Sequence, residues 1–185
     1  DLGRDVDNVN SFLHLCGRTD ANDIYCANFI IRNSTFHHLY HGLIEARCWT
    51  GIKEQVAAPS VEVTNCTFDY MGFMADGVWT GTKKGGQRYL FEFLGYAAKA
   101  EITLSRTIVG EVRTNNNNIR PTAFNNATLT CTATFKSTDT AFDSKFTATA
   151  TNLSSGQTFP KRAEYDFTPT TDYANFFGNG DPRWQ

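Results

Sequence analysis

Ile30–Phe36 reads IIRNSTF and Glu62–Phe68 reads EVTNCTF, and this repeat decides the fold that we predict. A fainter third copy, EITLSRTI, occupies 101–108. With Ser105 as the third turn residue, the polar turns follow one another at spacings of 32 and 40 residues. A strand and a polar turn that recur in this way are typical of a stacked architecture, in which each repeat, here called a rung, packs on its neighbour.

The stacking makes specific contacts predictable, because rungs about 4.8 Å apart place equivalent residues above one another. We expect Asn33 and Asn65 to form an amide ladder at the turn. Phe36, Phe68 and Ile108 should form an apolar stack inside the rungs.

The same pattern argues against a β-sandwich, whose hairpins favour Asn-Gly or Asp-Gly turns between alternating strands. The chain has one Asp-Gly pair, at 76–77, and its repeat is a unit of several strands rather than a hairpin. We therefore predict an all-β fold, a right-handed parallel β-helix, with its rungs in 1–113.

Beyond residue 113 the sequence pattern changes. Thr128–Phe135 (TLTCTATF) and Phe146–Leu153 (FTATATNL) alternate at period two, as half-buried strands do. We assign 114–159 to a pair of antiparallel strands that packs on the β-helix or caps it. The two strands could pair as a long hairpin or lie along the sides of the last rung. Residues 160–185 are rich in proline and aromatic residues, and we expect an extended C-terminal clasp that caps the stack.

Composition narrows the function classes. The chain carries 17 basic and 19 acidic residues, for a net charge of −2, without the basic excess of a nucleic-acid-binding protein. No run of 18 apolar residues occurs, so no membrane span is expected. The chain begins without Met and inside a strand-and-turn pattern, so we expect a processed product or the C-terminal part of a longer protein; an expression fragment is the alternative.

The cysteines show no metal-binding spacing, and their odd number leaves at least one unpaired within the chain. We expect buried thiols that pack as small apolar residues. Cys66 takes the place of Ser34 in the preceding rung, which fits a small packing position. The five are Cys16, Cys26, Cys48, Cys66 and Cys131.

Two C-terminal segments carry a family resemblance. YDFTP at 165–169 and GDPRW at 180–184 resemble the ending of pectate-lyase-like β-helix proteins of Bacteroidota, in which NCTF rungs precede them. The resemblance covers roughly 27–185. It implies the C-terminal part of a surface lipoprotein from a family of mostly unknown function, encoded near polysaccharide-uptake systems.

The GDPRW ending also has a structural interpretation. Pro182 fixes a turn, Arg183 can pair with a carboxylate, and Trp184 can cover an apolar end. We therefore predict a structural clasp at this motif.

The resemblance implies an extracellular or outer-membrane surface protein that contacts polysaccharide. Further partners would be other surface proteins or an upstream part of the same chain. Aromatic rings can stack on sugar faces, and Lys or Arg can contact acidic sugars along the side of a β-helix. The candidate carbohydrate-binding residues are Arg47, Trp49, Lys53, Tyr70, Trp79, Lys83, Lys84 and Arg88.

Two alternatives to a binding protein stay open. The first is a polysaccharide lyase or glycosidase with catalytic rungs partly upstream, in which a base such as Arg106 removes a proton that carboxylate-bound calcium acidifies, with Asp69 among the candidate carboxylates. No calcium motif appears, so no cofactor is expected, and the catalytic residues are unassigned. His37 and His41 lack the accompanying pattern of a metal site, so no metal is expected. The second alternative is a structural subunit or adhesin of a surface assembly.

Overall fold

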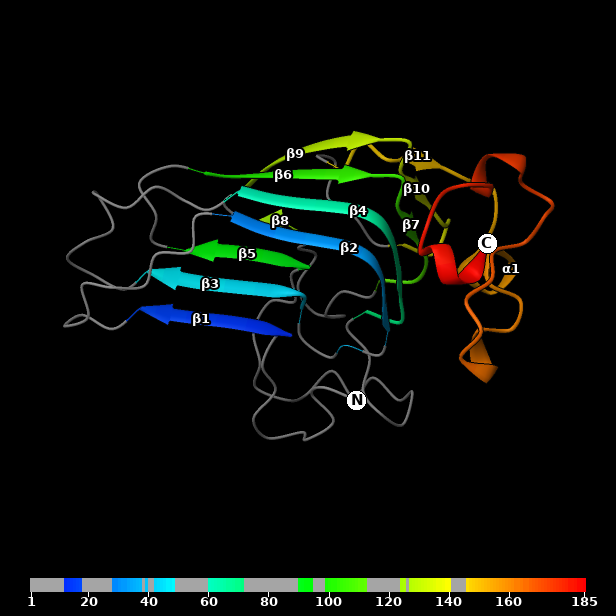
Figure 1. The fold of residues 1–185 in the computed structure, drawn as a ribbon, viewed down its shortest axis with the longest axis horizontal. Helices are drawn as coiled ribbons and strands as arrows, with labels where there is room; N and C mark the ends of the chain where they lie inside the picture. Colours follow the sequence, from blue (N-terminus) through cyan, green and yellow to red (C-terminus); the bar gives the residue numbers. More distant parts are fainter. Residues whose placement is uncertain are drawn as a thin grey trace.

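Parallel strands dominate the molecule, and helices occur only near the C-terminus of the described chain (Figure 1). None of these helices has the length and apolar character needed to cross a membrane. The computed structural model describes residues 12–17, 28–37, 39, 42–48, 60–71, 90–94, 99–112, 124–125, 127–140 and 146–185.

The strands form two sheets, and every pairing between described strands is parallel. From β1 to β6, consecutive strands alternate between the two sheets. The smaller sheet contains β1 (Leu13–Gly17), β3 (Ile44–Cys48), β5 (Phe91–Leu94) and β8 (Phe124–Asn125), paired in that order.

The larger sheet runs through β11-β10-β7-β4-β6-β9, with β2 also paired to β4. Its two long strands, β2 and β4, curve within their length, whereas each of the next two rungs is divided into two shorter strands (Figure 1). Its strands are β2 (Asn28–His37), β4 (Ser60–Asp69), β6 (Ala100–Ser105), β7 (Ile108–Val109), β9 (Ala127–Thr132), β10 (Phe135–Lys136) and β11 (Thr149–Ala150).

The larger sheet bends where one residue of each rung adopts the left-handed backbone region. The φ angles are 51° at Asn33, 52° at Asn65, 47° at Arg106 and 45° at Ala133. The strand register places these four residues in one column, here called the corner column. Asn tolerates this conformation better than most side chains, which explains why the first two rungs carry it there.

The predicted amide ladder is confirmed, because Asn65 Nδ2 donates to Asn33 Oδ1 at 3.2 Å. The predicted position of the third turn, Ser105, is wrong by one residue. Ser105 pairs with Thr64, so the residue that follows Asn33 and Asn65 in the corner column is Arg106. A polar serine resembles a turn residue in sequence, whereas an arginine with left-handed backbone is uncommon and was not anticipated.

The predicted apolar stack of Phe36, Phe68 and Ile108 is also wrong by one residue in its third member. Phe36 stacks on Phe68 as predicted, with ring centroids 5.5 Å apart and planes 15° from parallel. Phe68 then pairs with Val109, and Ile108 pairs with Thr67. The apolar column is therefore Phe36, Phe68 and Val109.

Alternating burial joins the two sheets into one core. In β4, Val61 and Val63 are buried and Glu62 between them is exposed, and β6 alternates in the same way. Phe91 and Phe93 of the smaller sheet belong to the same buried cluster as these residues. One face of each sheet thus supplies the apolar area that stabilises the stack.

The cysteine prediction is confirmed for Cys66, which pairs in register with Ser34, is fully buried and carries no disulfide. Burial raises the pKa of its thiol to about 11. Cys131 is also an unpaired thiol and is half-buried. Nothing is described of the side chains of the other three cysteines.

The predicted antiparallel hairpin is wrong. β9 pairs in parallel with β6, and β10 lies between β7 and β11 in parallel with both. Period-two alternation shows that one face is buried, but it carries no information on the direction of the neighbouring strand. The left-handed backbone at Ala133 divides the apparent strand and continues the parallel stack.

The C-terminal segment is less extended than predicted. It contains a one-turn α-helix and three 3-10 turns, and it packs on β7 and β10 through a second buried cluster that includes Phe159, Phe167 and Phe176. The expected packing of an aromatic tail on the body is thereby confirmed. Its helical elements are α1 (Ser155–Thr158), η1 (Arg162–Glu164), η2 (Ala174–Phe176) and η3 (Pro182–Trp184).

The corner column gives a first prediction. Asn65→Val should lower the free energy of unfolding by about 2 kcal/mol, because a β-branched residue is strained in left-handed backbone and the amide ladder is lost. Urea denaturation followed by circular dichroism measures this. Asn152→Val is the matched control, since Asn152 is exposed and its φ is not positive. Equal losses in both variants would contradict a special role for the corner.

Candidate functional site

The sequence-predicted carbohydrate site falls mostly outside the part of the chain that the structure describes. Arg47 lies in β3, where only its backbone is described. Tyr70 follows β4, and the guanidinium carbon of Arg162 lies 3.5 Å from its ring centroid, so that face of the ring is covered. The residues outside the described ranges are Trp49, Lys53, Trp79, Lys83, Lys84 and Arg88.

A buried ionic cluster joins the strands to the C-terminal segment beside Tyr70. Arg162 Nε lies 2.8 Å from Asp69 Oδ2, and Arg162 Nη2 donates to Glu111 Oε2 at 3.0 Å. Asp69 Oδ2 and Arg162 Nε have no hydrogen-bond partner, so this contact is an ion pair without hydrogen-bond geometry. The Asp69 side chain is fully buried and that of Arg162 is 10% exposed.

The chain makes room for this cluster at Gly110. A Cβ atom there would overlap Asp69 Oδ1 and lie 2.9 Å from the Phe159 ring. The absence of a side chain lets the Glu111 amide donate to Asp69 Oδ1 at 2.7 Å. From the other side, Ser155 bonds to both Arg162 and Asp139, which ties the turn after β10 to the same cluster.

Burial controls the charge of Asp69. It raises the pKa of the Asp69 carboxyl to about 7, although Arg162 and the neighbouring amides act in the opposite direction. A carboxyl with no exposed surface cannot contact a polymer or hold an ion against one. Asp69, a candidate carboxylate for a lyase, is therefore part of the internal framework.

The raised pKa gives a second prediction. Between pH 3.8 and pH 7 the folded state holds a proton on Asp69 that the unfolded chain releases, so stability falls as pH rises through this window. The free energy of unfolding contributed by Asp69 should drop by about 2.5 kcal/mol from pH 5 to pH 7.5. Asp69→Asn should remove this drop, measured by urea denaturation at both pH values.

Asp166→Asn is the control for this experiment. The pKa of Asp166 is lowered by hydrogen bonds from Thr168, so its own pH dependence lies below pH 4. A parallel change in the pH dependence of both variants would contradict the assignment to Asp69.

The GDPRW ending is fastened to three successive rungs at the corner column. Thr35 Oγ1 donates to Asp181 Oδ2 at 2.7 Å, and the Asp181 amide donates to Thr67 Oγ1 at 3.0 Å. The Gly180 amide donates to the Arg106 carbonyl at 2.8 Å. Gly180 has a φ of 85°, which glycine adopts without strain. These contacts tie the motif to the strands, as the structural interpretation of the ending expects.

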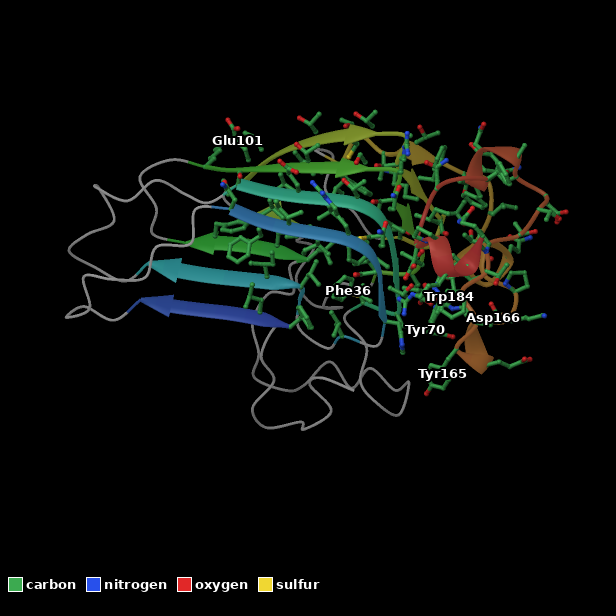
Figure 2. All side chains as sticks on the ribbon, viewed as in Figure 1. Phe36, Tyr70, Glu101, Tyr165, Asp166 and Trp184 are labelled. Carbon is green, nitrogen blue, oxygen red and sulfur yellow. The ribbon has the colours of Figure 1, made fainter. Side chains whose placement is uncertain are left out.

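Arg183 and Trp184 complete the clasp. Arg183 forms the predicted ion pair, with the buried carboxylate of Asp181. Burial by itself would raise the pKa of Asp181, but hydrogen bonds from Arg183 and Thr35 hold it below its usual value. Trp184 Nε1 donates to Thr35 Oγ1 at 2.6 Å, and Figure 2 places Trp184 and Tyr70 on the same side of the molecule, beside the C-terminal segment.

The clasp gives a third prediction. Asp181→Ala should lower the free energy of unfolding by about 3 kcal/mol, because it removes the buried, charged acceptor of the hydrogen bonds from Thr35 and Arg183. Limited proteolysis should also release the C-terminal segment faster. Asp172→Ala, an exposed carboxylate in the same segment, should change neither measurement. An Asp181→Ala variant with unchanged free energy of unfolding and unchanged proteolysis would show that aromatic packing alone holds the segment.

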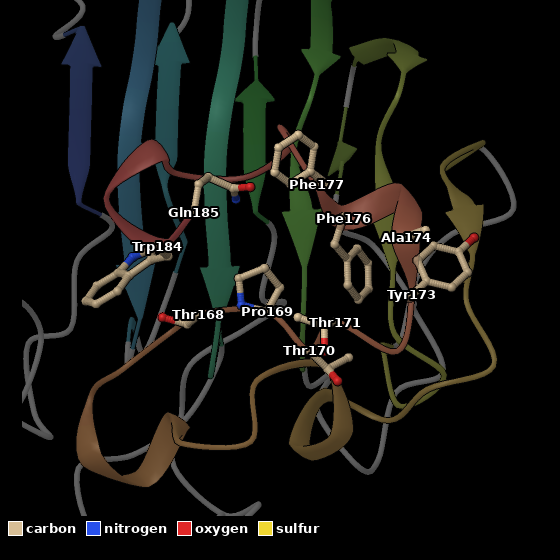
Figure 3. A pocket seen from close by; sticks show the side chains of 10 residues that line it. All are labelled: Thr168, Pro169, Thr170, Thr171, Tyr173, Ala174, Phe176, Phe177, Trp184 and Gln185. Carbon is tan, nitrogen blue, oxygen red and sulfur yellow. The ribbon is translucent and has the colours of Figure 1, made fainter.

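An aromatic cleft lies next to the clasp and is the candidate functional site (Figure 3). Its volume is about 310 Å³, and Figure 3 shows the Trp184 and Tyr173 rings on opposite sides of the 168–171 segment. Phe177 at its edge is 89% exposed, although it is a large apolar side chain. The lining residues are Thr168, Pro169, Thr170, Thr171, Tyr173, Ala174, Phe176, Phe177, Trp184 and Gln185.

Sequence reasoning missed this cleft because it treated the aromatic tail only as a cover for the stack. The available signal was the density of aromatic residues between Phe167 and Trp184. Which rings would be buried depended on folding: Phe176 is 2% exposed, whereas its neighbour Phe177 points outward.

Comparisons with known proteins leave the family open: no family model, curated protein or solved structure matches the chain. Within the described ranges, no three His, Cys, Asp or Glu side chains gather in a way that could hold a metal ion.

Proposed function

We propose that this chain is a polysaccharide-binding protein with a right-handed parallel β-helix fold, secreted or displayed at the outer-membrane surface. Its role would be glycan contact in polysaccharide utilisation, as the resemblance to surface proteins of Bacteroidota implies. The proposal involves no cofactor.

The β-helix part of the proposal is supported by the strand order. Consecutive strands from β1 to β6 alternate between two sheets, and the described pairings are all parallel. The corner column recurs in four successive rungs. Connections between parallel strands of one sheet are right-handed in about 98% of cases, which favours a right-handed coil.

The aromatic cleft is the observation that carries the binding proposal. Trp184, Tyr173 and Phe177 present ring surface around one cavity, and threonine hydroxyls accompany them. Sugar rings have flat faces of C–H groups and hydroxyls at their edges, and aromatic rings bury flat apolar surface of this kind. A largely apolar cavity with a few polar groups is also the usual form of a small-ligand site.

Binding is better supported than cleavage. The Asp69 carboxyl, the described carboxylate with the most strongly raised pKa, is fully buried and faces Arg162 rather than the cleft. The cleft itself is lined by hydroxyl, amide and apolar groups and contains no Asp, Glu, His, Lys or Cys side chain, which leaves Tyr173 as its one residue of a type used in general acid-base catalysis.

Affinity electrophoresis combined with an absorbance assay tests the proposal, our fourth prediction. The full chain is run through gels that contain uronic or neutral polysaccharides, and the same mixtures are followed at the ultraviolet absorbance of unsaturated uronides. We expect retardation relative to a polymer-free gel without new absorbance.

The other outcomes of this assay contradict the proposal in different ways. New absorbance that disappears on substitution of Lys83 or Arg88, two of the predicted carbohydrate-binding residues, would make the chain a lyase. If the chain shows no retardation and produces no new absorbance, glycan contact is contradicted and a structural subunit or adhesin is favoured.

A further inference from the structure

We infer that the aromatic cleft binds a neutral sugar unit rather than an acidic one. This inference rests on the proposed polysaccharide binding and names the ligand class of the site. It departs from the sequence-based expectation that Lys and Arg side chains contact acidic sugars.

The charge of the cleft carries the inference. None of its ten lining residues is Asp, Glu, Lys, Arg or His, so no charged side chain faces a ligand there. A uronate carboxylate placed among these groups would lose hydration without gaining a cation, which is costly. A neutral sugar loses only the hydration of its hydroxyls and of one apolar face.

Arg183 stands beside the cleft but does not supply the missing positive charge. Its Nε donates to Asp181 Oδ2 at 2.9 Å and to Oδ1 at 3.1 Å, and its Nη2 bonds to the same carboxylate. The pair is bidentate and sums to zero charge, so its field on a bound ligand is weak. Releasing Arg183 to a uronate would leave the buried Asp181 carboxylate without its cation.

The walls of the cleft are held in place by contacts with neighbouring side chains, most of which lie outside the cleft. Trp184 is fixed through its hydrogen bond to Thr35 and an edge contact with Phe167, whose centroid is 6.0 Å away. Tyr173 contacts Phe135 and Phe176 at centroid distances of 5.8 and 4.8 Å. Rings that are already ordered lose little conformational entropy when a ligand binds.

The size and edge of the cleft define the ligand further. About 310 Å³ lies at the lower end of the range for small-molecule sites, which suits one or two sugar rings of a chain that continues into solvent. Thr171 is exposed at the edge, where its hydroxyl can exchange hydrogen bonds with sugar hydroxyls. Thr168 and Gln185 are also exposed there, but the side chain of Thr168 already bonds to Asp166, and that of Gln185 to the backbone of Gly178 and Asn179. Phe177 would lose the most water-exposed apolar surface on binding.

The test compares neutral and uronic polysaccharides in affinity gels at low and high NaCl, with the full chain and two variants. Phe177→Ala removes an 89% exposed ring and leaves the clasp intact. Ile30→Ala is the matched control, because Ile30 is a 58% exposed apolar side chain on β2, outside the cleft lining.

We expect retardation by a neutral polysaccharide that salt leaves unchanged, since an uncharged cleft has no ionic contact to screen. Phe177→Ala should weaken this binding about tenfold, and Ile30→Ala should leave it unaltered. Circular dichroism of both variants checks that they are folded.

Two results would overturn the inference while the proposed function stands. One is retardation by uronic polymers alone, weakened by salt and insensitive to Phe177→Ala. The other is retardation by neutral polymers that Phe177→Ala does not affect, which would place the site elsewhere on the chain. Absence of retardation by every polymer would remove the proposed function itself.

Discussion

Left-handed backbone at Asn33, Asn65, Arg106 and Ala133 is the constraint on which the remaining structure depends. This conformation bends each rung of the larger sheet at the equivalent residue, so that the residues after the corner pair in a common register. Because side chains alternate between the two faces of a strand, a corner displaced by one residue would exchange its buried and exposed sets. A single apolar core between the two sheets therefore requires that every corner lie at the same position of its rung.

The corner column also organises the C-terminal segment. Thr35 and Thr67 pair in register two residues after their corners, so their hydroxyls form adjacent bonding groups on the face of the stack that the C-terminal segment covers. Asp181 bonds to both, one through its side chain and one through its amide. Farther along the same rungs, Asp69 and Glu111 hold Arg162. A regular array of strands thereby positions a segment that has little regular structure of its own.

The sequence was sufficient for features that repeat and insufficient for features that do not. The recurrence of Asn and Phe predicted the parallel stack, the amide ladder and the contact between Phe36 and Phe68. Its third copy was misaligned because the corner there is Arg106, a residue type that gives no turn signal. Strand direction at β9 and β10 could not be obtained from alternation, and the orientation of Phe177 depends on tertiary packing that no local pattern records.

The hydrogen bond from Trp184 to Thr35 joins residues 149 positions apart. During synthesis Thr35 leaves the ribosome 149 residues before the indole that it orients. The cleft therefore takes shape only after the strands between them have stacked. Affinity for a ligand in this cleft would therefore depend on the contact between the C-terminal segment and the strands. A molecule that has lost this contact would fail to bind while its strands still gave a normal circular dichroism spectrum.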